Sequence, residues 1–159
     1  MKAASLSTLK NELSTLPDEE VLKICMRLAR YKKENKELLN YLLFDAYDEA
    51  GYIDSIKSEI DQHFREINTS HLYYAKKSIR KILKITNKYI HYSGNKRTEA
   101  DLLIYFCIKL KNSGIPIRNS VSIHHLYLSQ VHKIKKAIAT LHEDLQFDYQ
   151  DEINLLKLN

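Results

Sequence analysis

Five basic side chains recur at helical spacing between residues 77 and 88, and this pattern has the clearest chemical meaning in the chain. Residues three, four or seven positions apart lie on one face of an α-helix. The stripe consists of Lys77, Arg80, Lys81, Lys84 and Lys88. A row of positive charges can follow backbone phosphates, which require charge and reach more than a particular geometry. Further along the chain, Lys133 and Lys136 complete the set of seven candidate nucleic-acid-binding or anion-binding residues.

The charge distribution supports this interpretation. Residues 67–142 hold fourteen Lys and Arg but only two acids, Glu99 and Asp101, so the net charge of +5 hides a strongly positive middle segment. Residues 1–66 hold ten bases and thirteen acids, and residues 143–159 hold one base and five acids. A concentrated positive field attracts polyanions or acidic partners. The first hypothesis is therefore a binding module, not an enzyme, that grips the phosphates of a nucleic acid.

A second hypothesis, from another class, is a protein-interaction scaffold. Its basic side chains would dock an acidic protein, or the acidic segments of another copy of the chain. A solvated helix face is the simplest interpretation of the same stripe. Like charges four residues apart destabilise a helix slightly, however, and this segment lacks compensating acids. The sequence leaves the partner and the oligomeric state open.

Arg and His residues at short spacing provide a third hypothesis. Five residues separate Arg65 from His71 and Arg118 from His124, and six separate Arg118 from His125. With Tyr127 two positions after His125, this pattern resembles the signature of HEPN-type ribonucleases, which are small all-α proteins. The resemblance implies RNA cleavage that depends on Arg118 and His125. It ranks behind the two binding hypotheses, and we assign no catalytic residue.

No residue pattern predicts a metal ion or a cofactor. His125 and His132 share a helix face, but the helical rise separates them by about 10 Å, too far for one ion. Glycine-rich phosphate loops are absent from the sequence. The acids Asp45, Asp48 and Glu49 are expected to form a polar helix end and not an acid–base pair.

Apolar residues follow helical periodicity in every long segment, so the fold is expected to be all-α. About six helices should pair into three antiparallel helical hairpins over residues 17–50, 52–92 and 96–143, as a HEAT-like α-α array or an irregular helical bundle. The whole chain, 1–159, is expected to form a single domain, with an acidic C-terminal tail over 144–159 available to dock. Expected helix boundaries are Gly51 as a stop, Ser70 as an N-cap, and Thr98 with Asp101 as a capping box.

Both cysteines, Cys25 and Cys107, lie far apart on apolar stripes, and we expect buried, reduced thiols. No apolar run approaches the roughly 18 residues of a membrane span. Residues 1–16 also lack the continuous apolar core of a signal peptide. These observations predict a cytoplasmic protein that does not bind a membrane.

Overall fold

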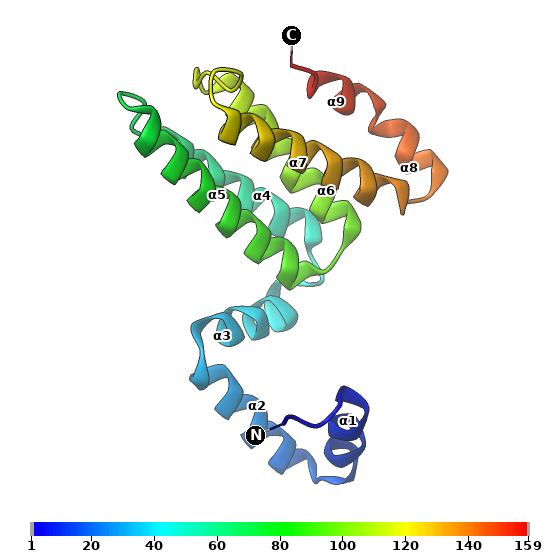
Figure 1. The fold of residues 1–159 in the computed structure, drawn as a ribbon. Helices are drawn as coiled ribbons and strands as arrows, with labels where there is room; N and C mark the ends of the chain where they lie inside the picture. The colour runs from blue at the N-terminus through cyan, green and yellow to red at the C-terminus, as the bar shows by residue number, and fades with distance from the viewer. Residues whose placement is uncertain (1, 159) are drawn as a thin grey trace. The chain divides into compact units, whose positions relative to one another are not determined.

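The structure is a computed structural model that describes residues 2–158, and these residues form helices and no strand (Figure 1). The all-α class is therefore confirmed, whereas the count of about six helices and the three-hairpin, HEAT-like arrangement are not. The chain divides into an N-terminal unit, Met1–Phe44, and a C-terminal unit, Asp45–Asn159. The two units are described separately, and a single domain over 1–159 stays a prediction.

Three helices and a π-helical turn make up the N-terminal unit. They are α1 (Leu6–Thr15), α2 (Asp18–Tyr31), α3 (Lys33–Asn40) and η1 (Tyr41–Asp45), the last of which ends at the junction. Pro17 occupies the N-cap position of α2, and three acids in its first turn complement the positive end of the helix dipole. An extended residue, Lys32, separates α2 from α3, and these two helices pack against each other.

The apolar stripes of the N-terminal unit form as predicted but remain exposed. Among residues 2–44, only Ala29 and Tyr41 are buried. The expectation that Cys25 is buried is therefore wrong, since its side chain is exposed on α2. Periodicity shows that a face is apolar, but it does not say whether another element covers that face.

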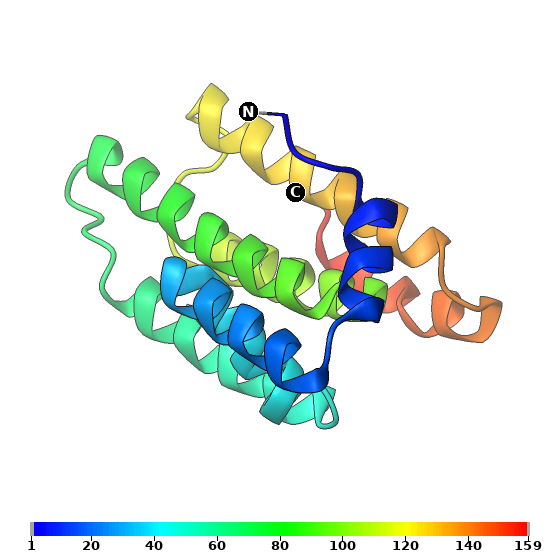
Figure 2. The same ribbon diagram turned by 90° about the horizontal axis from the view of Figure 1, so that it is seen from below.

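The C-terminal unit is built around α6 (Lys96–Asn112). This helix packs against α4 (Glu49–Arg65), α5 (Leu72–Ser93), α7 (Val121–Ala139) and α9 (Gln150–Leu155). In Figure 2, α5 (green) lies in front of α6 and hides much of it, and α7 (yellow to orange) lies above. Its buried positions extend around the helix and include Ala100, Leu102, Leu103, Ile104, Phe106, Cys107 and Leu110. An apolar surface on nearly all sides requires neighbours on nearly all sides, which explains the central place of α6.

Helices around α6 bury the stripes that the periodicity predicted. The buried residues include Ile53, Ile56 and Ile60 of α4, Ala75, Ile79, Ile82 and Thr86 of α5, and Ile123, Tyr127, Ile134 and Ile138 of α7. Side chains on the opposite faces of these helices consequently point to solvent.

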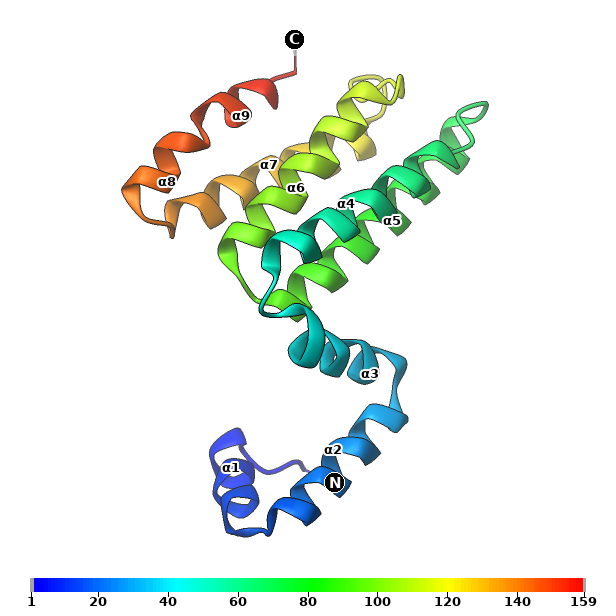
Figure 3. The same cartoon turned by 180° about the vertical axis from the view of Figure 1, so that it is seen from behind.

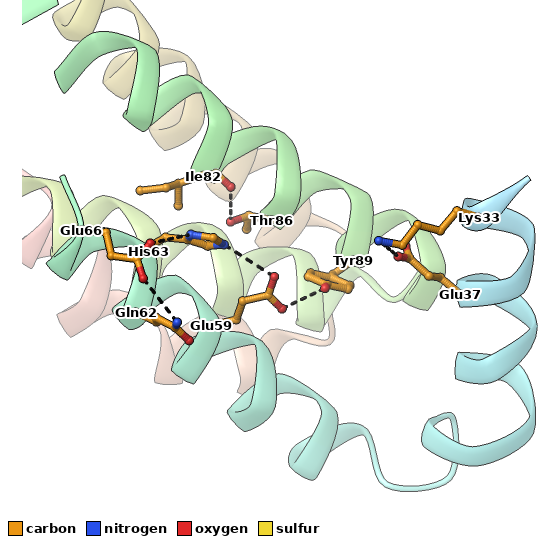
Figure 4. Close-up of polar contacts among 9 residues, drawn as sticks. All are labelled: Lys33, Glu37, Glu59, Gln62, His63, Glu66, Ile82, Thr86 and Tyr89. Carbon is orange, nitrogen blue, oxygen red and sulfur yellow. Dashed lines mark hydrogen bonds and ion pairs between the residues drawn. The ribbon is translucent and has the colours of Figure 1, made fainter. Parts of the chain in front are cut away.

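Hydrogen bonds join α4 to α5 beside this apolar contact. The Tyr89 hydroxyl donates to Glu59 Oε2 at 2.8 Å, and the Tyr52 hydroxyl donates to the Tyr89 carbonyl oxygen at 3.0 Å. Figure 4 shows Tyr89 reaching Glu59, with Thr86 donating to the carbonyl oxygen of the preceding helical turn. These bonds satisfy polar groups that would be costly to bury unpaired. In the N-terminal unit, the same figure shows an ion pair within α3, between Lys33 and Glu37.

Gly51 does not end a helix, so that prediction is wrong. It lies in the first turn of α4, where its amide N–H donates to Asp48 Oδ1 at 3.0 Å and completes the N-cap. A Cβ atom at position 51 would lie 2.3 Å from Asp48 Oδ2. The glycine therefore makes room for the capping carboxylate and does not serve as a helix stop.

Two other predicted caps are also wrong. His71, not Ser70, precedes the first residue of α5, and its side chain makes no capping bond. At the start of α6, Asn95 is the N-cap, while Thr98 is buried and donates to the carboxylate of Glu49. Glu49 also accepts from Ser93, so one carboxylate ties the start of α4 to the end of α5 and the start of α6.

The acidic C-terminal segment forms α8 (Glu143–Asp148) and α9, which lie along the α6–α7 pair (Figure 3). Its last carbonyl oxygens accept hydrogen bonds from three side chains. Lys111 Nζ donates to Leu155 and Lys157, Arg118 to Leu158, and the Tyr127 hydroxyl to Leu156, at distances of 2.7 to 2.9 Å. Positive groups at the end of α9 also suit the negative end of its dipole.

The core assignment predicts that Ile60→Ala and Ile134→Ala each lower the free energy of unfolding by about 2–5 kcal/mol. Both side chains are at most 1% exposed, so each truncation leaves a cavity. Leu128→Ala, at an exposed position of α7, is the matched control and should cost far less. Denaturant titrations that show a loss below about 0.5 kcal/mol at either core position would contradict the assignment.

Cysteine accessibility supplies a second prediction. Cys107 is fully buried, and burial raises the pKa of its thiol to about 12, so it should not react in the folded protein. A Cys25→Ser variant should therefore show no reactive thiol under native conditions and one after unfolding, measured with a thiol-specific chromophore. Rapid labelling of the folded variant would show that α6 is not central.

Candidate anion-binding face

The basic residues of α5 lie on the face opposite its buried stripe. Lys77, Arg80, Lys81 and Lys84 are exposed, whereas Lys88 is half-buried. At 100° per residue all five fall within an arc of about 100°, so they form one continuous row along the helix. The basic face is defined here as this row together with Lys133 and Lys136, which are exposed on α7.

Aromatic rings hold the last lysine of the row. Lys88 Nζ lies 4.8 Å from the ring centroid of Tyr89 and 5.9 Å from that of Tyr92. A cation above an aromatic face is attracted by the ring quadrupole, by about 0.5–2 kcal/mol. Lys88 is therefore more constrained than the other four basic residues of α5.

The remaining basic side chains carry uncompensated charge. Within residues 2–158, no carboxylate lies at ion-pair distance from Lys77, Arg80, Lys81, Lys84, Lys133 or Lys136. The docked acidic tail does not change this, because none of its carboxylates pairs with the basic face over the same range. Ion pairs therefore do not neutralise these six side chains within the described residues.

A hollow of about 520 Å³ is shared by the C-terminal part of α5, the start of α6 and α7. It is lined by Asn87, Ile90 and His91 of α5, by Asn95, Lys96 and Glu99 at the start of α6, and by Lys133 of α7. Lys96 Nζ pairs with Glu99 Oε2 at 2.6 Å, so Lys133 supplies the unpaired charge of the hollow. Arg80, Lys84, Asn87 and His91 share one edge of α5, which leads into this hollow. Lys136 follows Lys133 one helical turn later.

Sequence reasoning missed a second polar cluster, between α4 and α6. The Tyr105 hydroxyl donates to Asp61 Oδ1 at 2.7 Å, and Lys109 Nζ lies 2.8 Å from the same oxygen. Lys57 and Lys109 place their ammonium groups 5.4 and 5.2 Å from the Tyr105 ring centroid. The sequence shows i, i+4 spacing within two pairs, Lys57–Asp61 on α4 and Tyr105–Lys109 on α6. It contains no pattern that predicts contact between these two helices.

The pKa values of Asp61 and Lys109 are shifted by this geometry. Burial alone would raise the pKa of Asp61, but the hydrogen bonds from Lys109 and Tyr105 outweigh it, so the pKa lies below its usual value. The bond to Asp61 likewise raises the pKa of Lys109. These charges neutralise one another locally, and we treat the cluster as a structural link between α4 and α6.

The Arg–His pairs have structural partners. Arg118 lies in the segment between α6 and α7, where its Nη2 donates to the Leu158 carbonyl oxygen at 2.9 Å. His124 is half-buried and His125 exposed, with ring centroids 6.4 Å apart. Arg65 is the last residue of α4, and His71 precedes α5. The structure thus gives Arg118 a role in holding the C-terminal tail.

Within residues 2–158, no group of three or more His, Cys, Asp and Glu side chains converges in a way that could hold a metal ion. None of the helices over the same residues is sufficiently long and apolar to span a membrane.

Comparison with known proteins was negative in all three forms: no protein-family profile, no curated protein and no solved structure matches the chain.

The cluster around Asp61 predicts a pH-dependent stability difference. Asp61→Asn should lower the free energy of unfolding by about 1–2 kcal/mol near pH 7, toward the low end because the pair is partly exposed. The folded-state pKa is lowered, so the stabilisation is present above the unfolded value of about 4 and is lost as the pH falls through the folded-state value. Urea titrations should show the two proteins converging in acid.

Asp54→Asn is the control, because Asp54 is an exposed carboxylate on the same helix. This substitution should change the free energy of unfolding little, both near pH 7 and in acid. A gap between Asp61→Asn and the parent protein that persists unchanged well below pH 3 would contradict the ion-pair assignment.

Proposed function

We propose that the protein binds nucleic acid through phosphate contacts made by α5, the start of α6 and α7. The observation that carries the proposal is the shared hollow, which Lys133 of α7 lines together with His91, on the edge of α5 that also bears Arg80 and Lys84. His91 and Lys133, from helices far apart in sequence, thus line one hollow. A backbone that followed this surface could contact both helices at once.

The geometry of the α5 row suits a polyanion. Lys88 follows Lys77 by eleven positions, or about 16 Å along the helix axis, which is enough to contact several phosphates. Each phosphate that is neutralised releases condensed counterions, and this release favours binding. Uncompensated like charges four residues apart slightly destabilise the free helix, so a bound polyanion would also relieve their repulsion.

We expect the protein to show little preference for a particular nucleotide sequence. Lysine offers a mobile point charge, whereas bidentate recognition of guanine edges usually requires the planar guanidinium group of arginine. Arg80 is the one arginine in the basic face, and the chain has six in all. The uncharged amides of Asn87 and Asn95 line the hollow beside Lys133 and could bond phosphate or sugar oxygens.

An acidic protein is the alternative partner for the same surface, and binding assays separate it from nucleic acid. The ribonuclease hypothesis receives less support, because Arg118 is engaged by the C-terminal tail. We therefore propose a binding function and no catalytic step.

Salt dependence of binding tests the proposal. The triple variant Arg80→Gln, Lys84→Gln, Lys133→Gln should flatten the log–log dependence of affinity on salt by about two to three units, because each phosphate contact contributes about 0.7 on single strands or 0.9 on duplex. Gln is nearly as good a helix former as Lys, so the fold should be retained. Affinities for a single-stranded and a duplex oligonucleotide would be measured between about 50 and 200 mM salt.

The control variant Lys32→Gln, Lys33→Gln removes positive charge from the N-terminal unit and should leave the slope unchanged. If both variants flattened the salt dependence of affinity equally, the effect would be one of overall charge and not of the basic face. Absence of binding to either oligonucleotide at low salt would refute the proposal and favour an acidic protein.

A further inference from the structure

Two aromatic side chains at the start of α5 belong neither to the core nor to its polar links. Tyr73 and Tyr74 are 72% and 52% exposed. Within residues 2–158, neither hydroxyl has a hydrogen-bond partner in the protein, and no Lys or Arg side chain lies over either ring. By contrast, the hydroxyls of Tyr89 and Tyr127 both donate to partners outside their own helices. A large part of the Tyr73 and Tyr74 rings therefore faces solvent.

These two rings lie on the same side of α5 as its basic row. At 100° per residue, Tyr73 falls inside the arc of about 100° that the five basic residues span, and Tyr74 falls about 20° beyond one edge of it. Lys77 follows Tyr73 by one helical turn, or about 6 Å along the axis. The row of positive charge therefore continues into a pair of aromatic rings toward the start of the helix.

The rings contact each other edge to face. The centroids of Tyr73 and Tyr74 are 5.5 Å apart with an interplanar angle of 77°, and the His71 ring lies 6.0 Å from that of Tyr74 at 64°. A T-shaped contact uses one face of only one of the two rings. Tyr73 has no other ring contact within the described residues, so at least one of its faces is left free for a planar group.

Positive charge beside exposed aromatic rings is the combination by which many proteins hold single-stranded nucleic acid. The charges follow the backbone, and successive bases stack on the rings. Every base has a π-face, so stacking needs no particular sequence, whereas a duplex keeps these faces within its own base stack. We infer that Tyr73 and Tyr74 form a stacking platform for the bases of a single strand whose phosphates follow the basic face. This inference rests on the proposed function and narrows it to single-stranded nucleic acid.

Stacking and phosphate contact predict opposite preferences between single strand and duplex. Phosphate contacts alone favour the duplex, because its two strands carry the higher charge density and release more counterions per contact. Stacking favours the single strand, because only unpaired bases are free to leave their neighbours and cover a tyrosine ring. A preference for single strands is therefore the signature of the platform.

Three ligands of equal length separate the rings from the charges. They are an oligothymidylate, a phosphodiester chain of the same length that lacks bases, and a duplex. The protein should bind the oligothymidylate most tightly. Tyr73→Ala, Tyr74→Ala should weaken that binding at least about fivefold, the lower bound for loss of one stacked base, and leave its salt dependence and the other two affinities unchanged. Both positions are exposed and alanine favours a helix, so this variant should fold.

Two further variants serve as controls. Tyr31→Ala changes a tyrosine of the N-terminal unit that is 76% exposed and also lies near a lysine, with Lys32 Nζ 6.0 Å from its ring centroid. It should leave the affinity for oligothymidylate unchanged. Tyr73→Phe, Tyr74→Phe keeps both rings and removes only the hydroxyls, so it should bind like the parent protein.

A fluorescence measurement reports the contact itself. The chain contains no Trp, so Tyr73→Trp introduces a single indole at the platform. Oligothymidylate should quench its emission through stacking, whereas the chain without bases should leave the emission unchanged.

Three outcomes would overturn the inference, and they differ in what they say of the proposed function. Equal affinities for oligothymidylate and for the chain without bases would refute stacking and leave the phosphate contacts standing. A preference for oligothymidylate that survives Tyr73→Ala, Tyr74→Ala would place the stacking elsewhere on the protein. Failure of all three ligands to bind at about 50 mM salt would refute the inference together with the proposed function, and would favour an acidic protein as the partner.

Discussion

Burial of α6 on nearly all sides is the constraint on which the C-terminal unit depends. A helix with residues such as Leu102, Ile104 and Phe106 around its circumference cannot face water on any broad side. It must be enclosed, and α4, α5, α7 and α9 each supply part of the enclosure. Hydrogen bonds and ion pairs then fix the positions of these helices relative to α6. The carboxylate of Glu49 joins three helix ends, and that of Asp61 joins α4 to Tyr105 and Lys109 of α6.

The same constraint leaves the basic faces of α5 and α7 in contact with solvent. Since α5 and α7 turn their apolar stripes toward α6, their opposite faces must meet solvent. Within residues 2–158, Lys77, Lys84 and Lys133 on those faces have no carboxylate at ion-pair distance, and the start of α6 lines the hollow that contains Lys133. The acidic tail is bound by backbone contacts to Lys111 and Arg118 instead of by the basic face. Fold and proposed binding surface thus arise from one packing arrangement.

Periodicity in the sequence was sufficient to predict the centre of each buried stripe of α4, α5 and α7, such as Ile79–Ile82–Thr86, but not its ends, since Tyr52 and Ile90 are buried while Leu72 is only half-buried. Helix ends were less predictable, since several neighbouring residues can serve as the cap and distant contacts decide which of them does. Asn95 displaced Thr98 as the cap of α6 because Glu49, forty-nine residues away, binds the Thr98 hydroxyl. For Cys25, the stripe was identified correctly, but local sequence does not say whether another element covers a stripe, and Cys25 is exposed. The seven candidate site residues were recognisable from charge and spacing, whereas the hollow required the fold.

Chemical-shift mapping by NMR tests the proposed surface most directly. A short single-stranded oligonucleotide would be titrated into the isotope-labelled full chain at about 50 mM salt. The account predicts that the largest amide shifts occur near Lys84 and His91 of α5, at the start of α6 and near Lys133 of α7. Shifts confined to α1–α3 or to α8–α9, or no shifts at all, would contradict it.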